Sequence, residues 1–205
     1  MAVLRTLLVS LVLLAAGLGI LTVATDGFRA YTTETARRIR VREHPPLVPP
    51  LPLQTAAGGR TSFGELRGRW LLVDFIYTRC MSYCSVQGSE FARLQGPLAD
   101  PLAAGQVALL SVSFDPTHDD PAALADYQRQ HGDHGAGWIA ARPVDQADLT
   151  ALMHAFGVVA VPDGWGGFVH NAAIAVVDPA GRLVAILDWN DARAAARYVT
   201  QRLTP

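Results

Sequence analysis

The sequence predicts an α/β domain in which a mostly parallel central sheet with an antiparallel edge is flanked by helices on both faces, together with an N-terminal transmembrane helix. Three observations lead to this prediction. Two apolar runs, 71–77 and 107–114, have the length and composition of buried strands, and each precedes a segment with helical spacing. Two later runs, 171–177 and 182–187, flank a tight turn and should pair antiparallel. Lastly, the first residues are apolar enough to enter a bilayer.

The N-terminal segment is predicted to be a membrane anchor over residues 1–25. From Leu7 to Ala24 the chain is apolar apart from two hydroxyl residues. At about 1.5 Å per residue this run extends ~27 Å, close to the thickness of a bilayer's hydrocarbon core. A cleaved signal peptide is the alternative, but its apolar region is usually shorter. Five arginines between positions 29 and 42 follow the span, and the positive-inside bias would keep them in the cytoplasm.

Residues 26–52 are predicted to form a proline-rich tether ahead of a folded domain over residues 53–205. The segment 44–52 contains five prolines, which disfavour helix and favour extended polyproline conformation. Such a stretch acts as a semi-rigid spacer. The domain should begin with a hairpin whose strands, 53–55 and 61–63, are joined through a glycine turn.

The remaining elements follow from periodicity and from capping residues. Asp119, Asp120 and Pro121 favour the start of a helix, and Gly157 favours the end of another. Asn190 is expected to cap the last helix. The predicted helices cover 85–95, 121–131, 145–156 and 190–203, and a further short strand covers 138–141.

The only two cysteines, Cys80 and Cys84, lie on the predicted turn between the strand 71–77 and the helix 85–95. Unpaired backbone N–H groups and the helix dipole at such a turn favour thiolate over thiol. Thiolate attacks disulfides and binds metal ions, so this turn is the candidate site. The alternative is a pair of unrelated buried cysteines.

Composition excludes several other functions. The net charge of −1 provides no basic face for nucleic acid, so we expect no nucleic-acid partner. All 17 basic residues are arginine, which excludes a lysine-dependent phosphate loop or Schiff base.

Three sequence blocks carry a family resemblance. They are Asp74-Phe-Ile-Tyr-Thr-Arg-Cys80 with Cys84, then Ser113-Phe-Asp-Pro-Thr-His-Asp-Asp-Pro121, and His170-Asn-Ala-Ala-Ile-Ala-Val-Val-Asp-Pro-Ala-Gly-Arg182. In this order, over about residues 53–203, they resemble the Sco/SenC copper proteins of the thioredoxin superfamily. The resemblance implies a thioredoxin-like fold.

The resemblance also implies a ligand set, a location and partners. By motif position, Cys80, Cys84 and His170 would bind one copper ion. Family members are anchored in a membrane and help to assemble the binuclear copper centre of cytochrome c oxidase, so oxidase subunit II is the expected recipient and an upstream copper donor or thiol reductant the other partner. We therefore expect a single-pass protein of the cytoplasmic (inner) membrane with its domain on the periplasmic or outer side.

This sequence departs from the family pattern beside both cysteines. Family members usually have proline after each cysteine, whereas Met81 and Ser85 stand here. The loop should be less stiff without the proline rings, which would weaken copper affinity or shift the redox poise of the cysteine pair.

The donor types agree with copper independently of the resemblance. Soft thiolates select Cu(I), and an added imidazole makes a trigonal set that also holds Cu(II). A structural zinc site needs four ligands, and the chain has no further cysteine. We expect His170 to begin a strand beside the thiol turn, the alternative being a packed core or loop histidine. Asp115 and Asp119 either orient the site from outside or hold a turn.

A second class of function is a metal-free thiol–disulfide oxidoreductase of the cell envelope, with Cys80 and Cys84 as the redox dithiol. Cysteines at this spacing on a bent turn can bring their Cα atoms within the ~4.4–6.8 Å of a disulfide. Exchange would pass through a mixed disulfide and would not need His170. A peroxidase is disfavoured because Thr78-Arg-Cys80 lacks the Thr-x-x-Cys spacing. His131 and His134 have metal-like spacing but lie where a helix should end.

Overall fold

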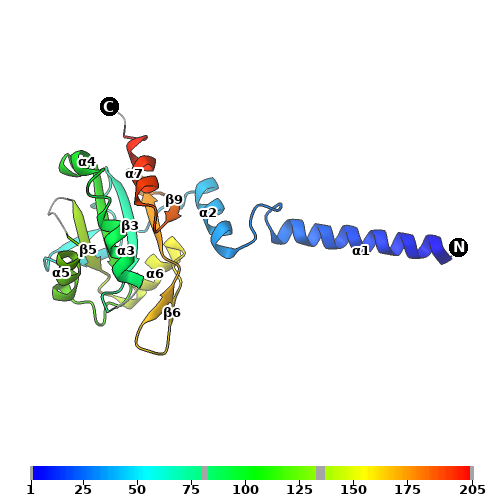
Figure 1. The fold of residues 1–205 in the computed structure, drawn as a ribbon, viewed down its shortest axis with the longest axis horizontal. Helices are drawn as coiled ribbons and strands as arrows, with labels where there is room; N and C mark the ends of the chain where they lie inside the picture. The colour runs from blue at the N-terminus through cyan, green and yellow to red at the C-terminus, as the bar shows by residue number, and fades with distance from the viewer. Residues whose placement is uncertain (1, 80–82, 133–136, 204–205) are drawn as a thin grey trace. The chain divides into compact units, whose positions relative to one another are not determined.

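The computed structural model describes residues 2–79, 83–132 and 137–203, with the backbone alone at 83–85 (Figure 1). The chain divides into two compact units, Met1–His44 and Pro45–Pro205.

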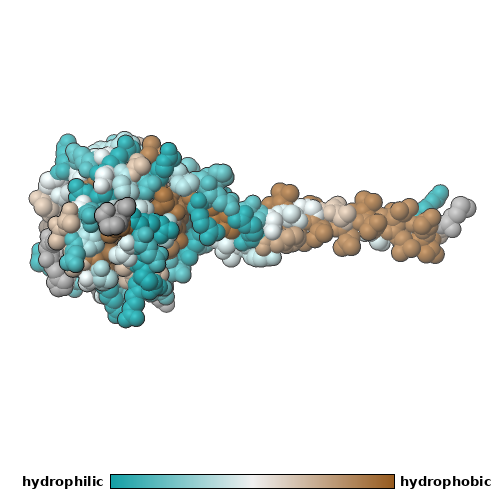
Figure 2. All heavy atoms as spheres, turned by 90° about the horizontal axis from the view of Figure 1, so that it is seen from above, coloured by the Kyte–Doolittle hydropathy of each residue, from teal (hydrophilic) through white to brown (hydrophobic). Residues whose placement is uncertain are grey.

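The first unit contains helices α1 (Ala2–Ala24) and α2 (Thr33–Glu43). By length and composition α1 could cross a membrane, with a mean hydropathy of 2.6, and it is the candidate anchor. Apolar side chains cover most of its visible face in Figure 2. Thr32 caps α2 by accepting a hydrogen bond from the Thr35 N–H, which satisfies a free donor of the first turn.

The second unit has a mixed sheet with helices on both faces, and its described part contains seven strands in the order β2-β1-β5-β4-β3-β8-β9. Two further strands, β6 and β7, pair as a separate ribbon. The strands are β1 (Pro52–Thr55), β2 (Arg60–Ser62), β3 (Trp70–Ile76), β4 (Val107–Ser113), β5 (Trp138–Arg142), β6 (Ala160–Pro162), β7 (Phe168–His170), β8 (Ala173–Val177) and β9 (Leu183–Asp188). The helices are α3 (Tyr83–Ala92), α4 (Ala99–Ala103), α5 (Pro121–Gln130), α6 (Gln146–Phe156) and α7 (Ala192–Thr200).

Strands β3, β4 and β5 are parallel and form the centre of the sheet. Strand β8 pairs antiparallel with β3 and is followed by β9, while the β1–β2 hairpin joins the opposite edge through β5. The mixed sheet with flanking helices is therefore confirmed, but the expectation of a mostly parallel sheet is wrong, because antiparallel pairs stand at both edges and outnumber the parallel pairs. The crossovers that connect parallel strands place helices over the sheet, which keeps both faces of β3 buried.

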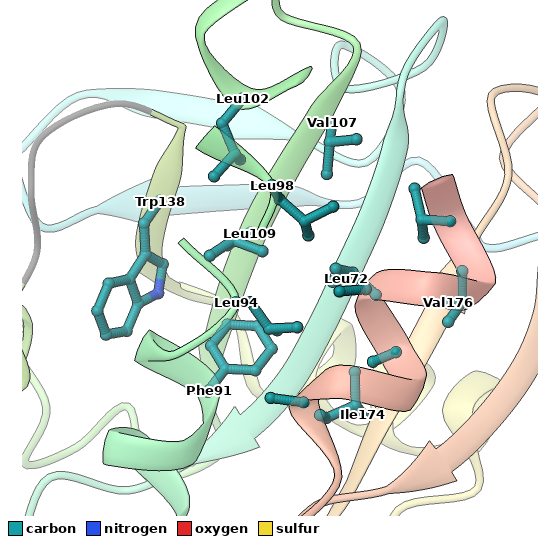
Figure 3. Packing of buried hydrophobic residues seen from close by; sticks show 14 of the residues in the cluster. Leu72, Phe91, Leu94, Leu98, Leu102, Val107, Leu109, Trp138, Ile174 and Val176 are labelled. Carbon is teal, nitrogen blue, oxygen red and sulfur yellow. The ribbon is translucent and has the colours of Figure 1, made fainter. Parts of the chain in front are cut away.

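One face of the sheet is covered by α3, α4, α5 and α7 (Figure 3). Leu72 and Leu109 of the central strands pack there with Phe91, Leu94 and Trp138. Burying one such apolar side chain contributes roughly 1.5–3 kcal/mol. This face anchors α3, the helix that begins at the predicted cysteine turn.

The other face is covered by α6. The Phe156 ring of α6 lies 5.1 Å from that of Phe75 on β3 and 5.5 Å from that of Phe63. Gly157 ends the helix in the left-handed region with a φ of 64°, as the sequence predicts.

Several boundaries differ from the prediction. The last helix begins at Ala192, and Asp191 rather than Asn190 caps it by accepting the Ala194 N–H at 2.8 Å. Helix α4 and the β6–β7 ribbon were not predicted, since both are short and glycine or proline interrupts their surroundings. His170 ends β7 and does not begin the following strand, which starts at Ala173.

Part of the proline-rich segment belongs to the second unit. The Val48 N–H donates to the Gly181 carbonyl at 2.9 Å, and the Leu183 N–H donates to the Pro46 carbonyl at the same distance. Val48 is buried. These contacts fix residues 46–48, which the sequence assigns to the tether, beside the turn between β8 and β9.

Candidate metal centre

The candidate site lies where β3 and β4 end. The parallel strands finish in register, with Ile76 opposite Ser113, so the segments that follow them emerge at the same edge of the sheet. The edge at the carboxyl ends of parallel strands is where ligands bind in open α/β sheets. Cys80 lies outside the described residues. Cys84 lies in the first turn of α3, and its side chain is also outside the described part.

His170, the predicted third ligand, is held at this same edge by aromatic rings. Its ring lies 5.1 Å from the ring of Phe114, which follows β4, and 6.3 Å from that of Tyr77, which follows β3. Burial lowers the pKa of His170. The imidazole is therefore neutral at neutral pH, which is the form that binds metal ions.

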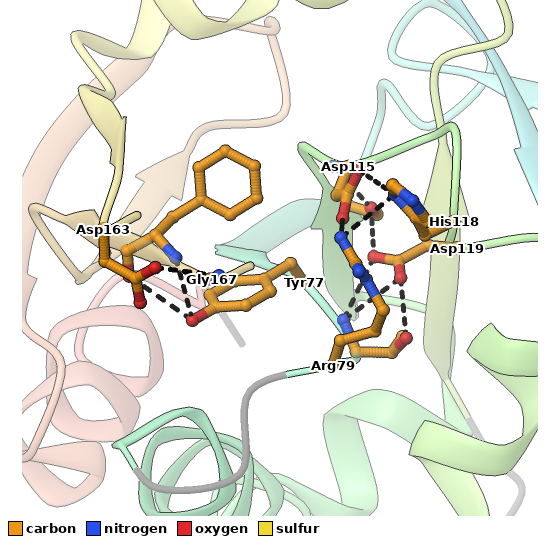
Figure 4. Close-up of polar contacts among 10 residues, drawn as sticks. Tyr77, Arg79, Asp115, His118, Asp119, Asp163 and Gly167 are labelled. Carbon is orange, nitrogen blue, oxygen red and sulfur yellow. Dashed lines mark hydrogen bonds and ion pairs between the residues drawn. The ribbon is translucent and has the colours of Figure 1, made fainter. Parts of the chain in front are cut away.

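Tyr77 connects the ribbon that carries His170 to the segment that leads to the cysteines. Its hydroxyl accepts a hydrogen bond from the Phe168 N–H at 3.2 Å and lies 3.3 Å from the Phe168 carbonyl oxygen, to which it donates (Figure 4). Its ring lies 5.2 Å from that of Phe168. Only two residues separate Tyr77 from Cys80. These contacts therefore link β7, which carries His170, to the segment that leads to Cys80. We call the contacting rings of Tyr77, Phe114 and Phe168 the aromatic junction.

Asp119 fixes the other side of the cysteine segment. Its buried carboxylate accepts hydrogen bonds from the Thr78 N–H at 3.1 Å, the Thr78 hydroxyl at 2.6 Å and the Ser113 hydroxyl at 2.5 Å. Burial raises the pKa of Asp119 although these donors act against the shift. Of the two roles expected for this residue, holding the loop is the one its contacts support.

The side chain of Arg79 contacts Asp115 and His118. Its guanidinium donates to Asp115 at 2.8 Å and lies 3.0 Å from Nδ1 of His118, which lies 2.8 Å from the other Asp115 oxygen. Burial alone would raise the pKa of Asp115, but the hydrogen bonds and charges of His118 and Arg79 lower it. The positive charge next to Cys80 is therefore partly neutralised.

A buried carboxyl group lies on β3, six residues before Cys80. Asp74 of β3 is 1% exposed, and its Oδ1 accepts a hydrogen bond from the Ser111 hydroxyl at 2.6 Å. Ser111 in turn accepts one from the indole N–H of Trp138 at 3.0 Å. Burial raises the pKa of Asp74 to about 7. This group was not singled out from the sequence, where it stands within an apolar run.

Within the described ranges 2–79, 83–132 and 137–203, no group of three histidine, cysteine or acidic side chains could hold a metal ion. The predicted ligand set depends on Cys80 and on the side chain of Cys84, so it stays a prediction. Nδ1 of His131 lies 3.3 Å from the Ser89 hydroxyl, and its ring is tilted against that of Tyr127, while His134 is outside the described residues. Sequence reasoning missed the aromatic residues Tyr77, Phe114 and Phe168, although two of them lie inside the matched blocks.

Comparison with known proteins identifies relatives of this chain. Residues 40–204 match the model of the SCO1/SenC family. A SCO1 protein homolog from Bacillus subtilis (strain 168) is 27% identical over 146 residues, which cover 70% of this chain and 73% of that protein. A putative copper-binding protein from Stutzerimonas stutzeri is 30% identical over 187 residues, covering 89% of this chain and 88% of the relative.

Solved structures show the same architecture. ScoI from Bradyrhizobium japonicum, solved with copper bound, is similar with a TM-score of 0.60 and 26% identity, covering 75% of this chain and 99% of that one. Yeast Sco1 with copper bound has a TM-score of 0.63 at 18% identity, covering 78% and 89% of the two chains. The latter identity supports the fold alone, and the fold is thioredoxin-like.

Proposed function

Since the chain belongs to the SCO1/SenC family, we propose that it binds copper through Cys80, Cys84 and His170 and delivers the ion to the binuclear copper site of cytochrome c oxidase. The observation that carries this proposal is the position of His170. The ring packs against those of Phe114 and Tyr77 at the edge of the sheet from which the cysteine segment emerges. Similar proteins described as copper-bound or copper-binding support the choice of metal.

The chemistry of the donor set fits Cu(I). Two thiolates and a neutral imidazole form a soft, three-coordinate set that zinc does not favour in a closed structural site. A helix start beside Cys84 stabilises negative charge on sulfur. Because Cu(I) is transferred as an ion, thiolates of a recipient can replace those of this chain one at a time with no change in oxidation state.

We place the copper-binding domain outside the cytoplasmic membrane, with α1 as a single-pass anchor. The apolar length of α1 and its position at the N-terminus support this assignment. The five arginines between positions 29 and 42 favour the opposite orientation under the positive-inside bias. We choose the outer side because an oxidase copper centre that lies there must receive its copper on that side. Reduction of the recipient's cysteines by the same dithiol is the companion function.

A competition titration tests copper binding directly. The reduced full chain in detergent should retain one Cu(I) against a chelator of comparable affinity, and His170→Ala should weaken Cu(II) binding at least tenfold while leaving the redox potential of the cysteine pair nearly unchanged. His154→Ala is the matched control, because His154 is exposed on α6. If no copper survives the competition while a disulfide substrate is still reduced, the chain is a thiol–disulfide oxidoreductase instead.

A further inference from the structure

The outer face of the β6–β7 ribbon exposes a group of apolar side chains next to the candidate metal centre. Trp165 at the tip is 94% exposed and Val169 is 69% exposed. Val161 lies directly opposite Val169 in the ribbon, and Val159, which is also exposed, immediately precedes β6. We call Val159, Val161, Trp165 and Val169 the ribbon patch. A tryptophan exposed to this extent is unusual, because its large apolar surface favours burial.

The loop that presents Trp165 is held in a defined conformation. Oδ1 of Asp163 accepts hydrogen bonds from the Trp165 N–H at 2.7 Å and from the Gly167 N–H at 3.0 Å, and the Asp163 N–H donates to the Gly167 carbonyl. Gly164 and Gly166 have φ values of 80° and 90°, which favour glycine. This hydrogen-bonded turn therefore holds the indole in the solvent.

The inner face of the same ribbon carries the predicted metal ligand. Side chains alternate along β7, so Phe168 and His170 face the aromatic junction while Val169 faces outward. Tyr77 hydrogen-bonds the backbone of Phe168. The ribbon patch and the imidazole thus lie on the two faces of one strand pair, and only the ribbon separates a molecule on the patch from the predicted metal ligand.

We propose that the ribbon patch is the docking surface for the protein that receives the metal ion from this chain. This inference rests on the proposed function. Direct transfer between two proteins requires that the surfaces around both metal sites meet and exclude water, and apolar side chains beside the ligand provide such a contact. Tryptophan is the residue type most often found as an anchor at protein interfaces.

The size and charge of the patch favour a transient protein partner over other occupants. Four side chains offer at most a few hundred Å², well below the roughly 800 Å² per partner of a stable interface, so a permanent dimer would need more surface. Residues 159–170 include Asp163 and neither arginine nor lysine, so nothing there would attract an anionic bilayer. A recipient that binds, takes the ion and leaves fits both features.

Transfer kinetics test the docking surface. The copper-loaded full chain in nanodiscs is mixed with the soluble, metal-free copper domain of cytochrome oxidase subunit II. Trp165→Ala should slow transfer about tenfold or more at subsaturating recipient, and Val169→Ser about threefold. Val144→Ser is the matched control, since Val144 is 62% exposed outside the ribbon, and it should transfer at the unaltered rate. Copper affinity should be the same in all of these proteins.

A metal-free titration keeps the inference separate from copper binding. Adding the recipient domain to the apo chain should blue-shift the emission of Trp165, isolated by subtracting the spectrum of Trp165→Phe. If the chain binds no copper but this shift occurs, the proposed function fails and the docking surface stands. Transfer that is unchanged in Trp165→Ala, together with an unshifted Trp165 emission in the unaltered chain, would overturn the docking surface. So would quenching of Trp165 by brominated lipid in the nanodisc, or self-association that Trp165→Ala abolishes.

Discussion

The loop that follows β4 and the β6–β7 ribbon both border the end of β3, but they are stabilised in different ways. Residues 113–119 form a dense polar network in which Asp119 is fully buried and binds Thr78. The ribbon stands apart from the main sheet, is anchored through Tyr77 and Phe168, and exposes Trp165. The polar loop fixes the segment that leads to the cysteines, while the ribbon positions the histidine and faces the solvent.

This difference bears on the proposed function, which requires a metal ion to be both held and released. A carboxylate that binds a backbone N–H and a hydroxyl defines where the chain leaves β3 with little freedom. A two-stranded ribbon has fewer supporting contacts, and local opening costs less in such elements. We infer that the imidazole is the ligand whose position adjusts during exchange.

The largest expected effect comes from removing the carboxylate of the polar loop. Asp119→Ala should lower the free energy of unfolding by about 3 kcal/mol, because it leaves buried donors of Thr78 and Ser113 without an acceptor. Chemical denaturation measures this loss. Asp120→Ala is the control, since Asp120 caps α5 through the Ala123 N–H and should cost about 1 kcal/mol. Equal losses in both variants would mean that the hydrogen bonds of Asp119 stabilise the fold no more than the helix cap of Asp120 does.

The second largest effect on stability is expected at Asp74, the carboxyl group buried in β3. Its pKa is about 7 in the folded chain and 3.8 in a solvated one, so the folded state binds more protons than the unfolded state between these values. Stability therefore falls as pH rises through this window. Relative to the unaltered chain, Asp74→Asn should gain roughly 2–3 kcal/mol between pH 5 and pH 8.

Denaturation at both pH values, with the cysteines reduced and no metal, measures this gain. Asp178→Asn serves as the control because Asp178 lies on the exposed turn between β8 and β9. A pH-independent difference between Asp74→Asn and the unaltered chain would show that the carboxyl group ionises in the fold as easily as in water.

A smaller effect is expected at the hydroxyl that ties the ribbon to β3. Tyr77→Phe keeps the aromatic contacts with Phe114 and Phe168 but removes the hydrogen bonds to the Phe168 backbone. We expect a loss of about 1 kcal/mol. Hydrogen exchange in β6 and β7 should accelerate, whereas exchange in β3 and β4 should not. Uniform acceleration across the sheet would contradict the separate stability of the ribbon.

The smallest effect on stability is expected at the ribbon tip. Trp165→Ala should change the free energy of unfolding by no more than about 0.5 kcal/mol, because a side chain that is 94% exposed makes few contacts to lose. Thermal unfolding measures this change. A large loss of stability would show that the indole packs against the domain and is not free to meet a partner.

Much of the fold could be predicted from the sequence because burial leaves a clear pattern. Strands β3 and β4 are continuous apolar runs, and Gly157 marks a helix end that requires a left-handed residue. The ribbon could not be predicted, since its strands are short and the glycine-rich segment 164–167 has no period. For that reason His170 was expected to begin a strand, whereas it ends β7.

The polar contacts of the site were harder to predict than its position. Asp115 and Asp119 are the same residue type, lie four residues apart and are both buried, yet one pairs with Arg79 and the other binds Thr78. Local sequence does not distinguish these roles, because they depend on how the loop folds back over β3. Asp74 shows the same limit, since its partner Ser111 comes from a neighbouring strand.

The proposed centre requires one imidazole to share a metal ion with two thiolates. X-ray absorption at the copper edge of the Cu(I)-loaded full chain tests this most directly. We predict two sulfur scatterers and one nitrogen scatterer, with the nitrogen lost in His170→Ala and retained in His154→Ala. A spectrum with sulfur scatterers alone, unchanged by His170→Ala, would contradict the proposed centre.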